Sequence, residues 1–205
     1  MFLTIHPDNP NERLIEKAAE IVAGGGIIIF PTDSVYALGC DAFNNKAVER
    51  VCRILGKKPE KANLSLICKD LSNLSEFTTP INTATFKLMR RALPGPYTFI
   101  LKANSNVPKI FKTNKKTVGI RVPDNAICHA LLAKLEHPMV SSSIHSDDEI
   151  LDYITDPEEI YENYHKLVDA VIDGGTGDNQ PSTVVDCTED IPIVIREGKG
   201  VLDEL

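Results

Sequence analysis

The chain has 205 residues, a formal net charge of −7 and 42% hydrophobic residues. A chain of this length buries roughly 70% of its unfolded surface, so a core forms without disulfides or metals. The composition is globular and excludes disordered, collagen-like and coiled-coil chains, and no apolar run reaches the roughly 20 residues of a membrane span. Five widely spaced cysteines and an N-terminus unlike a signal peptide predict reduced thiols and a cytoplasmic protein.

The first half of the chain is predicted to alternate helices and strands. Apolar residues at helical spacing predict a helix over residues 10–23, with Asn9 as its cap and Pro10 as its first residue. The apolar run 26–30 predicts a strand buried on both faces, followed by a turn at 31–34. Further strands are expected over residues 35–40 and 64–68, and helices over residues 45–55 and 83–93.

The second half continues the same alternation. Strands are expected over residues 97–102, 117–122, 139–143, 168–172, 182–185 and 193–196, and helices over residues 125–135 and 156–165. Asp156 and Pro157 are a typical cap and first residue for the last helix. The fold class is therefore α/β, or α+β, with one mixed sheet. No linker rich in Pro, Ser or Gly divides the chain, so one domain over residues 1–205 is expected.

Charge is distributed unevenly along the chain. Residues 87–121 carry nine basic side chains and no acidic one, whereas residues 122–190 carry two basic and sixteen acidic ones. Such a segment creates a local positive field inside an acidic protein. It predicts either a solvated basic face or a site for an anionic partner.

Hydroxyl side chains follow the buried strand over residues 26–30. Thr32, Ser34 and Tyr36 come directly after this strand, and the strand ends of α/β sheets are common ligand sites. The cluster favours either a small polar ligand or an ordinary Ser/Asp turn.

Lysines crowd the segment after the helix predicted over residues 45–55. Lys57, Lys58 and Lys61 lie within five residues, and ammonium groups bind phosphate oxygens as point charges. The segment is either a polyphosphate-binding loop or a solvated loop.

The remaining polar motifs lie late in the chain. Ser141–Ser143 end an apolar strand and suit hydrogen bonding to an anion, and His145 after them reads most simply as a surface residue. Arg196 can bind a phosphate or carboxylate through two N–H groups. The sequence contains no GxxxxGK[ST], GxGxxG or HExxH motif and no Ser–His–Asp spacing. Hydroxyls and cations favour binding and electrostatic catalysis over covalent chemistry.

Several blocks in order resemble the YrdC-like family of threonylcarbamoyl-adenylate synthases, from about residue 10 to residue 198. The blocks are GGGIIIFPTDSVYALGCDA, KKP-x3-N, LPGPYTFIL, TVGIRVPDN, PMVSSSIH, PSTVVD and IVIREG. Each block alone is weak evidence for the family, but the order and spacing of the blocks together are specific to it. The segments IHPDNPNERL and CRILGKKPEKANLSLICKDLSNLS look most like the YciO subgroup.

The resemblance implies a YrdC-like twisted, open mixed sheet flanked by helices, with a basic concave surface. It implies a nucleotidyltransferase-type reaction in which L-threonine, bicarbonate and ATP with Mg²⁺ give threonylcarbamoyl-AMP and pyrophosphate for the t6A37 modification of tRNA. The alternative is a non-catalytic protein of the same fold that binds double-stranded RNA, tRNA or a nucleotide. A monomer or homodimer without a protein-bound metal or membrane partner is expected.

Matching the family motifs assigns residues to three sites. The resemblance implies Thr32, Cys68, Arg121 and Ser141 for threonine, Lys57, Lys58, Ser143, Ser182 and Arg196 for the nucleotide, and Lys61, Lys112, Lys115 and Lys116 for RNA. No catalytic residue is assigned. The chain departs from the family pattern at three points, because Lys58 lacks the arginine fork, His145 replaces an asparagine and Cys68 replaces a histidine.

Overall fold

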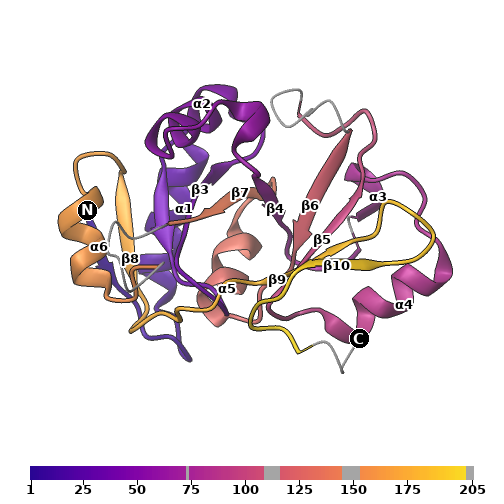
Figure 1. Cartoon of the computed structure of the whole chain (residues 1–205). Coiled ribbons are helices and arrows are strands. Elements are labelled where there is room, and N and C mark those ends of the chain that lie inside the picture. The colour runs from indigo at the N-terminus through magenta and orange to yellow at the C-terminus, as the bar shows by residue number, and fades with distance from the viewer. Residues whose placement is uncertain (73, 109–115, 145–152, 202–205) are drawn as a thin grey trace.

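A computed structural model describes residues 1–72, 74–108, 116–144 and 153–201 (Figure 1). Within these ranges, no helix is both long enough and apolar enough to cross a membrane. The five cysteines are free thiols, as the sequence predicted.

The described strands form one twisted, open, mixed sheet in the order β1-β8-β2-β3-β7-β4-β6-β5-β9-β10. The strands are β1 (Phe2–Thr4), β2 (Ile28–Phe30), β3 (Ala37–Asp41), β4 (Ser65–Ile67), β5 (Tyr97–Lys102), β6 (Thr117–Arg121), β7 (Met139–Ser143), β8 (Ala170–Asp173), β9 (Thr183–Asp186) and β10 (Ile193–Arg196). Parallel pairs join β8 to β1 and β2, β4 to β6, and β5 to β9, and the other neighbours are antiparallel. The predicted mixed α/β sheet is confirmed.

Most of the helices begin at a side chain that caps their first turn. The helices are α1 (Glu12–Ala23), α2 (Asn45–Ile54), α3 (Leu74–Phe77), α4 (Thr83–Ala92), α5 (Ala126–Lys134) and α6 (Pro157–Tyr164), with a 3-10 turn at Pro59–Lys61. The caps of α1, α2, α4 and α5 are Asn11, Asn44, Asn82 and Asn125, and each accepts a hydrogen bond from the N–H three residues on. Asparagine is among the best cap residues because its side-chain oxygen satisfies an otherwise unpaired N–H of the first turn.

One face of the sheet is covered by helices at both ends. Alternate strand residues such as Leu38, Leu66, Phe99, Ile120 and Val140 point to this face and are fully buried. Helices α2 and α6 pack against it toward one end of the sheet, and α3 and α4 pack against it toward the other (Figure 1).

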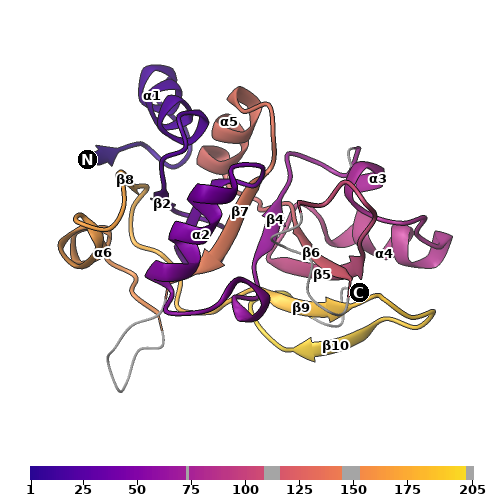
Figure 2. The same ribbon diagram turned by 90° about the horizontal axis from the view of Figure 1, so that it is seen from above.

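The opposite face is covered over one half only. Helices α1 and α5 pack together over Ile28, Phe30, Ile67 and Met139, which are the residues of opposite parity in their strands (Figure 2). Strands β5, β6 and β9 receive no helix on this face within the described part of the chain. One half of this face is therefore left open, and the cavity described below lies there.

The start of α1 differs from the prediction. Asn9 and Pro10 were expected as the cap and first residue, but Asn11 is the cap, and its Oδ1 accepts a hydrogen bond of 3.2 Å from Leu14 N–H. The backbone N–H of Asn9 instead donates to His6 Nδ1. The sequence also missed β1, α3 and the 3-10 turn, because three or four residues are too few for a periodic pattern.

A pair of substitutions tests the position of this cap. Asn11→Ala should lower the free energy of unfolding by about 1 kcal/mol, because one N–H of the first turn loses its partner. Asn9→Ala should change it by less than about 0.5 kcal/mol, as exposed substitutions usually do. Urea denaturation followed by circular dichroism measures both, and equal losses would contradict the placement.

Candidate ligand-binding cavity

A cavity of about 1040 Å³ lies over the open half of the sheet. Side chains along each strand point alternately to the two faces of the sheet, and those on one face form the floor of the cavity. In β6, Thr117, Gly119 and Arg121 line the cavity, whereas Val118 and Ile120 lie in the core. The side chains of β5 alternate in the same way between the cavity lining and the core. One strand thus supplies a packed core on one face and a polar floor on the other.

Small residues form the middle of the floor. Ser141 of β7 pairs with Ser65 of β4, and Ser65 pairs with Gly119 of β6, so three neighbouring strands present small side chains in one row. A Cβ at Gly119 would lie 2.8 Å from Ser65 Oγ. Because these side chains are small, the cavity is deep at this point, and the serines line it with hydroxyl groups.

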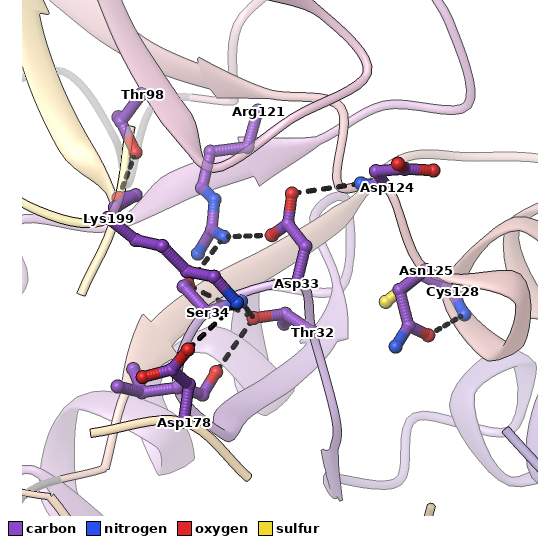
Figure 3. Close-up of polar contacts among 12 residues, drawn as sticks. Thr32, Asp33, Ser34, Thr98, Arg121, Asp124, Asn125, Cys128, Asp178 and Lys199 are labelled. Carbon is purple, nitrogen blue, oxygen red and sulfur yellow. Dashed lines mark hydrogen bonds and ion pairs between the residues drawn. The ribbon is translucent and has the colours of Figure 1, made fainter. Parts of the chain in front are cut away.

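The deepest charged group in the cavity is Arg121. Its guanidinium Nη2 donates to Asp33 Oδ1 at 3.0 Å and to Ser34 Oγ at 2.9 Å (Figure 3). The side chains of Arg121 and Asp33 are 5% and 7% exposed. Asp33 Oδ2 also accepts from Asp124 N–H at 2.9 Å. The turn after β2 therefore supplies the counter-ion that holds the arginine at the end of β6.

The ionisation of this arginine reflects two opposed effects. Burial lowers the pKa of the Arg121 guanidinium, and the nearby Asp33 carboxylate raises it. An arginine remains protonated in proteins, so the site holds a fixed positive charge. Arg121 Nε is buried and has no hydrogen-bond partner among the described residues. Arg121 lines the cavity, and its fixed positive charge there favours an anionic ligand.

Thr32 supports this turn from outside the cavity lining. Its Oγ1 donates to the carbonyl of Val35 at 2.7 Å and accepts from Ser34 N–H at 3.1 Å. It therefore stabilises the turn that carries Ser34 and Asp33. This is the role expected if residues 31–34 form an ordinary Ser/Asp turn. Its hydroxyl also lies 3.2 Å from Ser34 Oγ, which accepts from Arg121.

A second arginine lies at the β9 side of the cavity. Arg196 donates through Nη2 and Nε to the carbonyl of Ser182, at 2.7 and 3.2 Å. Ser182 Oγ in turn lies 2.8 Å from Thr98 Oγ1 of β5. Hydroxyls from two strands and a guanidinium therefore meet at one wall.

The rim carries charges of both signs. Lys57, Lys61 and Lys102 line the cavity, and so do Asp186 and Glu189. Lys102 Nζ lies 3.7 Å from Glu189 Oε1, but both side chains are more than half exposed, so this pair adds little stability.

The structure gathers most of the residues predicted for the site. The residues that line this cavity are Lys57, Lys61, Arg121, Ser141, Ser143, Ser182 and Arg196. Lys58 and Lys116 are exposed and lie outside its lining. Lys112, Lys115 and His145 lie outside the described residues.

Cys68 is separated from the other residues predicted to bind threonine. Ser65 faces the cavity, but Cys68 lies three positions further along the chain and packs in the core on the opposite face. Burial raises the pKa of its thiol to about 12, so the thiol is protonated near neutral pH. Cys68 instead lines a second cavity at the other end of β4.

The lining or supporting residues that the sequence interpretation missed include Asp33, Ser65, Thr98 and Gly119. The alternation of polar or small residues with apolar ones in 97–102 and 117–121 could have indicated the floor. The Arg121–Asp33 pair joins residues 88 positions apart, and no local pattern signals it.

Comparisons with known proteins agree with this fold. The family model for Sua5, YciO and YrdC proteins, described as "Telomere recombination", matches residues 20–198. The Escherichia coli protein YciO, described as uncharacterized, is 48% identical over 201 residues, which cover 97% of this chain and 96% of that protein. Its crystal structure matches with a TM-score of 0.91 at 45% identity, over 100% of this chain and 98% of that one.

Threonylcarbamoyl-AMP synthases are more distant relatives. The Bacillus subtilis synthase is 31% identical over 197 residues, which cover 95% of this chain and 56% of the synthase. The crystal structure of P. abyssi Sua5 complexed with L-threonine matches with a TM-score of 0.87 at 26% identity, over 97% of this chain and 57% of that chain. The chain therefore belongs to the Sua5/YciO/YrdC family, and it has close YciO homologues.

The buried ion pair predicts a specific stability pattern. Asp33→Ala should lower the free energy of unfolding by about 3 kcal/mol, because it leaves the Arg121 charge buried without a counter-ion. Adding Arg121→Met should restore part of the loss, because no buried charge then remains. Denaturant titration of both variants measures this, and a double variant no more stable than Asp33→Ala would contradict it.

Proposed function

We propose that this protein is a nucleotide-dependent L-threonylcarbamoyladenylate synthase. The observation that carries the proposal is the fixed positive charge of Arg121 in the lining of a hydroxyl-lined cavity on the family fold. A guanidinium suits an amino-acid carboxylate, and this one is already oriented by Asp33 and Ser34. The synthases among its relatives and the L-threonine complex of P. abyssi Sua5 support the choice of substrate.

The cavity is large enough for two substrates side by side. Its volume of about 1040 Å³ is at the upper end of small-molecule sites. Arg121 and Ser141 lie on the β6–β7 side, where threonine is expected. Lys57 lines the cavity beside the 3-10 turn, and Ser182 and Arg196 line it from the β9–β10 side. These groups are expected to hold ATP.

In the proposed reaction, the nitrogen of the threonine amine bonds to the carbon of bicarbonate, which gives a carbamate and releases water. A carbamate oxygen then attacks the α-phosphorus of ATP, and the bond to the β-phosphate oxygen breaks to release pyrophosphate. Negative charge accumulates on phosphate oxygens, where lysine and arginine donors stabilise it. The chain's contribution is therefore to position the two substrates and to supply fixed positive charge, without a covalent intermediate on the protein.

Mg²⁺ is expected to enter with ATP, where it would neutralise phosphate charge. The described residues contain no cluster of three or more His, Cys, Asp or Glu able to hold a metal. Asp186 and Glu189 line the cavity and offer carboxylates. One or two carboxylates with substrate phosphates are the usual ligands of such an ion, so the residues present fit it.

A second candidate function is binding of tRNA or double-stranded RNA without turnover. The observation that favours it is the exposure of Lys57, Lys58 and Lys61 around the 3-10 turn, two of which line the cavity. Exposed lysines neutralise backbone phosphates and give salt-dependent affinity. The same face could serve both candidates, because both ligands carry phosphates.

Pyrophosphate release from Mg-ATP, bicarbonate and L-threonine tests the first function. Release should depend on threonine, and Arg121→Lys should lower kcat/KM for threonine at least tenfold because the two-point contact is lost. Asp33 then still has a cationic partner, and a thermal melt checks that the variant is folded. Release that is independent of threonine, or absent while tRNA still binds, would reject the synthase and leave the binding function.

Two adjacent lysines give a matched test of the nucleotide site. Lys57→Ala should raise the dissociation constant for Mg-ATP about fivefold, because one phosphate contact is lost. Lys58→Ala should change it less than twofold, because Lys58 lies outside the cavity lining. Isothermal titration calorimetry of both variants measures the difference. Equal effects would overturn the assignment of Lys57 to the nucleotide site.

A further inference from the structure

A second cavity of about 390 Å³ lies at the opposite end of β4 and β7 from the first. It opens where β3 and β4 end and where β7 begins, beside Phe43, Cys68 and His137. The chain leaves β3 toward α2 and leaves β4 toward α3, and both helices pack on the same face of the sheet. Crevices at the carboxyl ends of strands are frequent ligand sites of α/β sheets.

An oriented aromatic pair forms one wall of this cavity. Phe43 is 41% exposed, and its ring centroid lies 4.7 Å from that of His137. Asp41 fixes both residues, because its Oδ1 accepts from Phe43 N–H at 2.8 Å and its Oδ2 lies 3.2 Å from His137 Nδ1. Phe77 continues the wall, with its ring 6.2 Å from Phe43. The aromatic surface is therefore held in place without a ligand.

Carboxylates dominate the charge around this wall. Asp70, Glu76 and Glu136 line the cavity, against one ammonium from Lys69. Asp70 accepts hydrogen bonds from the backbone N–H and the hydroxyl of Ser72, which lower the pKa of its carboxyl. The cavity thus combines an excess of negative charge with an exposed ring. This is the reverse of the first cavity, where lysines and arginines line much of the wall.

We propose that this second cavity is a binding site for a small, partly apolar organic cation, such as an alkylguanidinium or alkylammonium compound. The cation would lie on the face of Phe43 between the carboxylates of Asp70, Glu76 and Glu136, because aromatic faces and carboxylates both attract cations. Its alkyl part would pack against the apolar floor provided by Leu132 and Leu135 of the α5 end. Such a site has no part in binding ATP, which the carboxylates would repel.

A pair of nearly isosteric probes tests the charge requirement. Butylguanidinium should bind with a dissociation constant of the order of 1 mM, and neutral butylurea at least tenfold more weakly. Titration of ¹⁵N-labelled protein by NMR measures both, with shifts expected for the amides of Phe43, Lys69 and His137. No shifts at about 10 mM butylguanidinium, equal binding of butylurea, or shifts confined to the first cavity would overturn the proposal.

Matched variants test whether the cation binds in the second cavity. Phe43→Ala, and separately the Glu76→Gln/Glu136→Gln pair, should each raise the dissociation constant at least threefold. Phe86→Ala is the control, because Phe86 on α4 is 39% exposed and does not line this cavity. An equal loss in Phe86→Ala would overturn the placement. A blocked Gly-Arg-Gly tripeptide that binds more tightly than butylguanidinium would overturn the assignment to a free small molecule and point to an arginine of a partner protein.

Discussion

The ion pair between Arg121 and Asp33 is the interaction on which the arrangement of the larger cavity depends. Arg121 ends β6, and Asp33 lies in the turn after β2, on the far side of β3, β7 and β4 in the sheet. A buried charge without a partner is strongly unfavourable, so the pair ties the turn to the open half of the sheet. It also holds the guanidinium in the lining of the cavity. One contact therefore both ties distant strands together and keeps a positive charge in the site.

The second constraint is that one face of the sheet is only half covered. Helices α1 and α5 seal Ile28, Ile67 and Met139, whereas the same face of β5, β6 and β9 forms the cavity floor. The alternate residues of these strands remain packed in the core on the other face. The cavity therefore does not disturb the core.

The structure shows where two of the residues that depart from the family pattern lie. Cys68 was expected beside threonine, but the alternation along β4 turns it away from Ser65 and toward the second cavity. Lys58 was expected beside phosphate, yet only its neighbour Lys57 lines the first cavity. The retained residues, in particular Arg121, Ser141 and Ser182, lie together. The altered positions described by the structure thus lie outside the cavity that holds the retained ones.

The sequence by itself determined the class of fold, the order of most helices and strands and the family. Apolar periodicity and cap residues are local signals, and they survive in any tertiary context that buries the apolar side. It also marked Arg121, Ser182 and Arg196 through motifs. Only the tertiary structure decided that Asp33 neutralises Arg121, that Cys68 belongs to another cavity and that Phe43 and His137 form a wall with Asp41. These contacts join distant positions, and their energies depend on burial, which no local pattern encodes.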